Sequence, residues 1–354
     1  MRYAACNELV HDRTFPEACA LIARQGYQGI ELAPYSLADN PLRISPRRAH
    51  EIRRNIADAG LECVGLHWLL KAPPGLHITT PDVTVRQRSW GAVRFLVDFC
   101  HAVGGSLVVL GSGKQRGAQG ISRDAATAIL CDELSALEPH LEQAGVALLL
   151  EPLQVQVTDV LNTLDEARAL IEATGSHWIA SMLDVHNSQD EREPWAQLIT
   201  AHADIVRHVH LNEVDGHHPS PVERPGRARS AYAAAFAALA DTGYKGWISL
   251  ETFHAADSPA TVLAETRAFL DSMIGLSGAG IRHTRSHTTR RERGMNKTAW
   301  VYRGILPAMQ CPFTPDLQID ESELRRFTAW LAGHRGIGGL VTNGHTGEVF
   351  ALSA

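Results

Sequence analysis

The chain has 354 residues and a formal net charge of -6 at pH 7. This length exceeds the usual size of one compact domain, whereas a closed α/β barrel needs roughly 250 residues, so we expect a barrel with an appendage. The acidic balance argues against a nucleic-acid partner, because a protein that tracks phosphates carries a basic stripe on its folded domain.

Short apolar runs predict eight β-strands, and helical periodicity fills each interval between them. The runs are residues 3–8, 28–33, 61–68, 106–111, 146–151, 179–184, 206–212 and 247–251. In the interval after the fourth run, one helix face is marked by Leu130, Leu134, Leu137 and Leu141. Alternating strands and helices over residues 1–275 predict an α/β protein with a (β/α)₈ barrel, and a doubly wound open sheet is the alternative.

Helix boundaries carry their own signals. Thr14 with Glu17, and Thr163 with Glu166, have the spacing of capping boxes. Glycines stand where several predicted helices stop before the next strand: Gly26, Gly60, Gly145, Gly175 and Gly243. These signals support the same alternation of helices and strands.

Four successive predicted strands, the fifth to the eighth, each end in or next to a residue that can bind a metal ion. These residues are Glu151, Asp184, His210 and Glu251. Closure of a barrel brings the carboxyl ends of its strands to one face. Three carboxylates and one imidazole suit a divalent cation such as Mn²⁺, Co²⁺, Mg²⁺ or Zn²⁺. We therefore predict one metal site at the mouth of the barrel.

Other polar residues near the predicted mouth are candidates for binding a substrate. His67 ends the third predicted strand, and His186 lies two residues beyond Asp184. Lys114 and Arg116 follow the fourth strand, where cations can hold a phosphate or a carboxylate. Arg224 lies in the long loop 215–227, whose glycines and prolines suit a lid.

The character of the sequence changes after residue 275. Residues 276–294 lack apolar periodicity and are rich in arginine, so we interpret them as a basic linker. Order resumes within 295–354, where a strand, a helix and a second strand are predicted.

The compartment follows from cysteine usage and the absence of targeting signals. The six cysteines form no Cys-x-x-Cys pair, so we expect reduced thiols. We find neither a signal-peptide core nor ~18 uninterrupted apolar residues, so we predict a cytoplasmic protein that does not cross a membrane. The sequence does not decide whether the protein forms a homo-oligomer.

Residues 1–275 resemble the xylose-isomerase-like barrels of sugar phosphate isomerases and epimerases, a group with ketose 3-epimerases, hydroxypyruvate isomerase and inosose dehydratase. The matching motifs include CNE at 6–8, GYQGIELAPYSL at 26–37, GLHW at 65–68, EPL at 151–153, LDV at 183–185, HVHLNE at 208–213 and GYKGWISLETF at 243–253. The resemblance implies that Glu151, Asp184, His210 and Glu251 bind one divalent metal. It also implies that Glu151 and Glu251 exchange a proton with a hydroxy-carbonyl substrate through an enediolate, which the metal stabilises.

The sequence departs from the ketose 3-epimerase pattern at two positions. Val157 stands where those enzymes place a second glutamate, and Asn187 stands where they place a histidine. We therefore expect proton transfer on a sugar or keto-acid without naming the compound. Dehydration of an inosose or of 3-dehydroshikimate by the same barrel remains an alternative.

Residues 301–353 resemble the N-terminal part of the dihydrodipicolinate synthase and N-acetylneuraminate lyase family. The matching stretches are GILPAMQCPFTPD at 304–316 and GLVTNGHTGEVFALS at 339–353. We interpret 295–354 as a truncated fragment of that family and Met295 as its original start, which implies a fusion of two genes.

Two other classes of function compete with an isomerase or epimerase. One is an abasic-site endonuclease, which uses the same barrel with three zinc ions. His67 and the pair Asp215 and His217 could bind zinc in such an enzyme. The fourth strand, however, ends in residues 111–113, Gly-Ser-Gly, where a histidine would be needed. The second alternative is a non-catalytic barrel that binds a ligand or a partner. The number of bound metal ions distinguishes the three.

Overall fold

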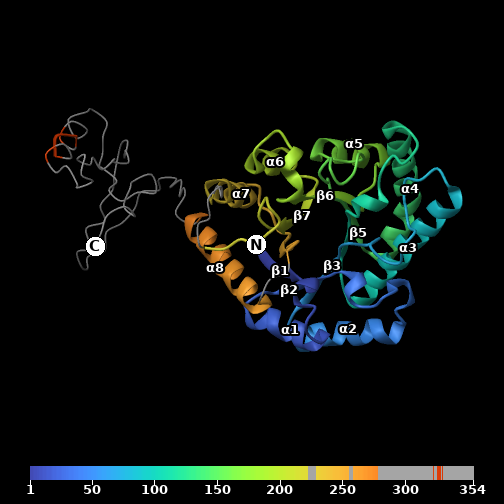
Figure 1. The fold of residues 1–354 in the computed structure, drawn as a ribbon, viewed down its shortest axis with the longest axis horizontal. Coiled ribbons are helices and arrows are strands. Elements are labelled where there is room, and N and C mark those ends of the chain that lie inside the picture. Colours follow the sequence, from blue (N-terminus) through green and yellow to red (C-terminus); the bar gives the residue numbers. More distant parts are fainter. Residues whose placement is uncertain (222–228, 255–257, 278–321, 323–324, 328, 330–354) are drawn as a thin grey trace, which may run out of the picture. The chain divides into compact units, whose positions relative to one another are not determined.

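The barrel is closed. A computed structural model describes residues 1–221, 229–254 and 258–277, together with 322, 325–327 and 329. Eight parallel strands follow one another in chain order, and β8 pairs with β1 to complete the ring (Figure 1). The predicted (β/α)₈ barrel is thus confirmed, and the open-sheet alternative is wrong.

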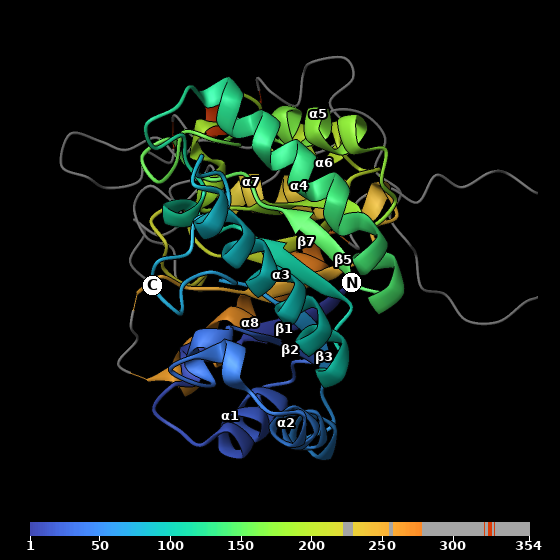
Figure 2. The same ribbon diagram turned by 90° about the vertical axis from the view of Figure 1, so that its right-hand side faces the viewer.

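Each strand overlaps one of the predicted runs. The strands are β1 Arg2–Cys6, β2 Gly29–Leu32, β3 Glu62–Leu66, β4 Leu107–Leu110, β5 Ala147–Leu150, β6 Ile179–Asp184, β7 Val206–Leu211 and β8 Trp247–Leu250. The main helices are α1 Phe15–Arg24, α2 Pro46–Asp58, α3 Val83–Val103, α4 Arg123–Ala144, α5 Leu164–Thr174, α6 Trp195–Ala201, α7 Arg229–Asp241 and α8 Pro259–Ser277. They surround the strands as an outer ring, and the side view has α3 and α4 in front of the sheet (Figure 2).

The core has two layers, as expected for a barrel whose strands point alternate side chains inward and outward. The inner layer includes Val64, Val109, Leu149, Met182 and Trp247, which pack together inside the strands. The outer layer lies between the strands and the helices, and the predicted α4 face is fully buried in it: Leu130, Leu134, Leu137 and Leu141. Burial of this face holds α4 against the sheet.

Most of the predicted helix ends are confirmed. The Thr14 N–H donates to the Glu17 carboxylate at 3.0 Å, as a capping box requires. At α5 the Thr163 hydroxyl accepts from the Glu166 N–H, but the Glu166 carboxylate accepts from Asn162 instead of Thr163. Gly145 ends α4 with φ at 65°, a left-handed conformation that glycine adopts without strain.

The barrel belongs to a unit that spans Met1–Arg282. Arg224, the linker 276–294 from residue 278 onward, and nearly all of the predicted fragment 295–354 lie outside the described residues. In the part that is described, no helix is both long and apolar enough to cross a bilayer. The cysteines described there are all free thiols, as predicted: Cys6, Cys19, Cys63, Cys100 and Cys131.

Candidate metal centre

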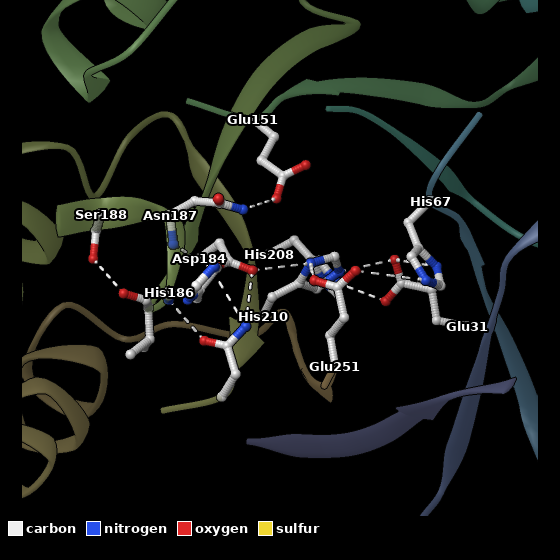
Figure 3. Close-up of polar contacts among 12 residues, drawn as sticks. Glu31, His67, Glu151, Asp184, His186, Asn187, Ser188, His208, His210 and Glu251 are labelled. Carbon is white, nitrogen blue, oxygen red and sulfur yellow. Dashed lines mark hydrogen bonds and ion pairs between the residues drawn. The ribbon is translucent and has the colours of Figure 1, made fainter. Parts of the chain in front are cut away.

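Four strand ends bring the predicted metal ligands together at one end of the barrel (Figure 3). Asp184 is the last residue of β6, His210 lies near the end of β7, and Glu151 and Glu251 directly follow β5 and β8. The strand register pairs Asp184 with His210, so these two side chains lie at the same level of the barrel. Parallel pairing around a closed ring therefore creates the site from residues that are up to 100 positions apart, Glu151 and Glu251.

The four side chains converge on a common point. Each offers one ligand atom, and these atoms all lie within 4.8 Å of one another. Nδ1 of His210 lies 2.9 Å from Oε2 of Glu251 and 3.6 Å from Oδ2 of Asp184. Within the described residues, neither His210 Nδ1 nor Glu251 Oε2 makes a hydrogen bond, although both atoms are buried. Buried polar atoms need a partner, and a divalent cation would supply one for both.

The charges of the site also fit a cation. Burial, together with the negative charges of Asp184 and Glu251, raises the pKa of Glu151 to about 8. Burial raises the pKa of Glu251 as well, against the opposing effect of His210. Three carboxylates in one buried cluster repel one another, and a divalent ion between them would remove that repulsion. The residues present therefore fit a divalent metal.

A buried carboxylate on β2 orients His210, the histidine among the candidate metal ligands. Glu31 is fully buried, and its two oxygens lie 3.1 Å from Nε2 of His210 and 2.8 Å from Nε2 of His208. Burial alone would raise the pKa of Glu31, but the two histidines hold it well below its usual value. An ionised Glu31 only accepts hydrogen bonds, so His210 must carry its proton on Nε2. Nδ1 is then the nitrogen directed at the cluster, and its lone pair would be available to a bound metal ion.

Two asparagines hold the carboxylates of the cluster. The Asn187 backbone N–H donates to Oδ1 of Asp184 at 2.7 Å, and its side-chain amide donates to Oε1 of Glu151 at 3.0 Å. Asn212 donates from its side-chain amide to both oxygens of Asp184. Burial would raise the pKa of Asp184, but contacts with His210 and these amide donors lower it. Asn187 thus connects the candidate ligands at the ends of β5 and β6.

A cavity of about 480 Å³ opens above the cluster. Glu151 and Glu251 line it, and so do three residues that were predicted to bind substrate: His67, Lys114 and His186. The rest of its wall includes Trp68, Lys71, Leu153, Val157 and Phe253. The cavity therefore gives a small molecule access to two of the four candidate metal ligands.

His67 and His186 occupy different environments in this cavity. His67 is almost fully buried, and its Nε2 lies 2.8 Å from the Glu8 carboxylate. Burial alone would lower the pKa of His67, but the neighbouring carboxylates, Glu8 foremost, raise it to about 9. His186 lies at the rim, with Nδ1 2.7 Å from the Val214 carbonyl and its ring 4.6 Å from that of Phe253.

Arg116 does not face the mouth, which corrects its predicted role in binding an anion. Its side chain is fully buried, and the guanidinium donates to backbone carbonyls of Leu110, Glu151, Val160 and Leu161. Burial lowers its pKa to about 10. Arg116 thus ties the end of β4 to the loop after β5, and Lys114 is the cation of this segment that lines the cavity.

Several residues around the cluster were not predicted from the sequence: Glu31, His208, Asn212, Trp68 and Lys71. Two of these carried a detectable signal. Glu31 is a charged residue inside the apolar run GIEL, and His208 stands two residues before His210. Side chains two apart in a strand point to the same face, so the assignment of β7 as a strand would have placed His208 beside His210.

Comparison with known proteins gives a family and a set of relatives. The sequence model of one protein family, the xylose isomerase-like TIM barrels, matches residues 19–273. The 3-dehydro-D-guloside 4-epimerase of Escherichia coli K12 is 27% identical over 149 residues, which are 42% of this chain and 55% of that protein. Fructoselysine 3-epimerase of Escherichia coli O157:H7 is 25% identical over 122 residues, 34% of this chain and 44% of that protein. The matches thus span about half the length of these curated relatives.

Solved structures share the fold. L-Ribulose 3-epimerase superposes with a TM-score of 0.68 at 20% identity, covering 80% of this chain and 99% of that one. D-Psicose 3-epimerase, solved in the presence of D-fructose, gives a TM-score of 0.66 at 16% identity, covering 78% of this chain and 100% of that one. At such identities the likeness concerns the arrangement of strands and helices alone.

Proposed function

The chain belongs to the xylose isomerase-like TIM-barrel family, and we propose that it is a sugar epimerase or isomerase that depends on one divalent metal ion. The observation that carries this proposal is the convergence of three carboxylates and one imidazole within 4.8 Å at the base of a cavity. The names of the two curated relatives, both sugar epimerases, support the same class of reaction.

Glu151, Asp184, His210 and Glu251 would hold the metal. When bound, such an ion supplies positive charge next to a carbonyl and a hydroxyl oxygen, which acidifies the adjacent carbon-bound proton. Glu31 keeps His210 in the tautomer that binds through Nδ1, and Asn187 fixes one oxygen each of Glu151 and Asp184. The chain thus preorganises the site before a substrate enters.

Glu151 and Glu251 would also move the proton, because both line the cavity and come from strands on different parts of the ring. One carboxylate removes the proton from carbon, and the other returns a proton. Return to the opposite face of the same carbon gives an epimer. Return to the neighbouring carbon, together with transfer of the hydroxyl proton to the former carbonyl oxygen, gives an isomer. Asp184 is absent from the cavity lining, so it would serve as a ligand alone.

The cavity wall favours a substrate that combines a hydroxy-carbonyl group with an anionic end. Lys114 and Lys71 are exposed cations in the lining. The same lining also offers apolar surface from Leu153, Val157 and Phe253, and Val157 is 44% exposed. A sugar phosphate or a sugar acid would place its charge near a lysine and its carbon skeleton along this surface.

Counting bound metal ions tests the proposal. We expect one divalent ion per chain after removal of excess metal, and none in Asp184→Ala, measured by elemental analysis of the full-length protein. Three ions per chain would favour an abasic-site endonuclease, and none in the wild type would favour a barrel that only binds a ligand. Either result would contradict the proposed function.

A further inference from the structure

Trp68 contacts one of the candidate metal ligands directly. It lies just beyond β3, is partly buried and lines the cavity. Its indole N–H donates a hydrogen bond of 2.8 Å to Oε1 of Glu251. The other oxygen, Oε2, makes no hydrogen bond within the described residues and lies 2.9 Å from His210 Nδ1. The indole therefore separates the two oxygens of Glu251 into one that is held and one that is left for a metal.

The backbone at Trp68 adopts an uncommon conformation to make this contact. Its φ is 52°, in the left-handed region. A bulky residue without glycine's freedom seldom adopts that region, and such strain persists only where the surroundings enforce it. The strained residue here is the one that places an indole against Glu251.

Packing fixes the direction of the ring. Tyr35 contacts it edge-on with ring centroids 6.4 Å apart, and Phe253 does so at 6.3 Å. The Lys71 ammonium lies 4.7 Å from the centre of the Trp68 ring and 3.9 Å from that of Tyr35. With three neighbours around it, the indole has little freedom to turn its N–H away from the carboxylate.

We propose that Trp68 is a positioning residue, which holds Glu251 by its Oε1 so that Oε2 faces the metal. This inference rests on the proposed function, since it concerns the same carboxylate. An indole N–H needs an acceptor wherever it is buried, and Trp195 satisfies this need outside the cavity by donating to the Ser188 hydroxyl at 2.9 Å. Trp68 differs in that its acceptor is a carboxylate of the metal cluster.

The test compares Trp68→Phe with Trp195→Phe. Each change keeps an aromatic ring and removes one indole N–H from a partly buried side chain. Loss of a group that orients a metal ligand lowers metal affinity or activity by about 10–100-fold. We expect Trp68→Phe to weaken Mn²⁺ binding, measured by calorimetry on the apo protein, by about tenfold or more. We also expect kcat to fall with little change in KM, and Trp195→Phe to match the wild type in both.

A double-mutant cycle identifies the route of the effect. If Trp68 acts through Glu251, then Trp68→Phe should weaken Mn²⁺ binding much less when Glu251 is already glutamine. Trp68→Leu, which has no hydrogen-bond donor in its side chain, serves as the second variant if the phenylalanine variant does not fold. Wild-type metal affinity and kcat in the folded variants would overturn this inference alone. A wild-type protein that binds no metal would overturn the proposed function together with it.

Discussion

Replacing Glu151 or Glu251 by glutamine should abolish turnover while leaving the barrel folded. Each change removes a negative charge from the cluster and a group that exchanges a proton. Positioned acids and bases contribute roughly 10²–10⁴-fold, and weaker metal binding adds to that loss. The fold should tolerate Glu151→Gln, because glutamine resembles a neutral carboxyl group. Burial and neighbouring carboxylates already favour that neutral form in the metal-free protein, where they raise the pKa of Glu151 to about 8.

Activity should be measured with purified protein and saturating metal, alongside the melting temperature. Glu142→Gln is the matched control, since this glutamate is exposed on α4 and the same chemical change there should leave activity intact. Retention of more than a tenth of wild-type activity by both Glu151→Gln and Glu251→Gln would contradict the assignment of proton transfer to these two residues.

The second large effect should be on stability and should come from Arg116. Arg116→Met would remove the side-chain donor from the buried carbonyls of Glu151 and Val160. It would also leave the carbonyls of Leu110 and Leu161 with only their backbone donors, the N–H groups of Glu151 and Leu153. Each buried polar group left without a partner costs about 1–3 kcal/mol, so we expect a loss of roughly 3 kcal/mol or more in the free energy of unfolding. Denaturant unfolding of the variant and the wild type measures it.

Lys114→Met provides the control from the same loop. Lys114 is exposed and lines the cavity, so its loss should leave stability within about 0.5 kcal/mol of the wild type. It should instead raise KM for substrates with an anionic group more than for neutral ones. Unchanged stability in Arg116→Met would show that the carbonyls find other partners, and the structural role given to Arg116 would then be wrong.

The strands and the four candidate ligands were predictable because both depend on local patterns. In an apolar run such as ALLL in β5, alternate side chains are buried in the inner and the outer layer of the core. The polar residue that follows the run marks the end of the strand. Closure then brings all such ends together whatever the details of the loops. Glu151, Asp184, His210 and Glu251 could therefore be placed without coordinates.

The surroundings of the cluster were less predictable because they depend on where individual side chains point. Lys114 and Arg116 are both cations two residues apart, yet one lines the cavity and the other is buried under backbone carbonyls. Lys114 lies inside a short 3₁₀ helix, Gly113–Gln115, and Arg116 directly follows it, and a sequence pattern does not distinguish the directions of the two side chains. Trp68 was missed because its contact with Glu251 requires a left-handed backbone, which no pattern in GLHW indicates.

Deuterium incorporation tests the central claim most directly. The full-length protein with Mn²⁺ would be incubated in D₂O with ketoses, their phosphates, hydroxypyruvate, keto-inositols and dehydroshikimate, followed by NMR and product analysis. We expect one sugar or sugar acid to gain deuterium at the carbon next to its carbonyl and to give an epimer or isomer, and Glu251→Gln to give neither. Product analysis also detects a proton that is returned without solvent exchange. A dehydrated product would contradict the epimerase or isomerase assignment, and turnover that persists in Glu251→Gln would contradict the mechanism.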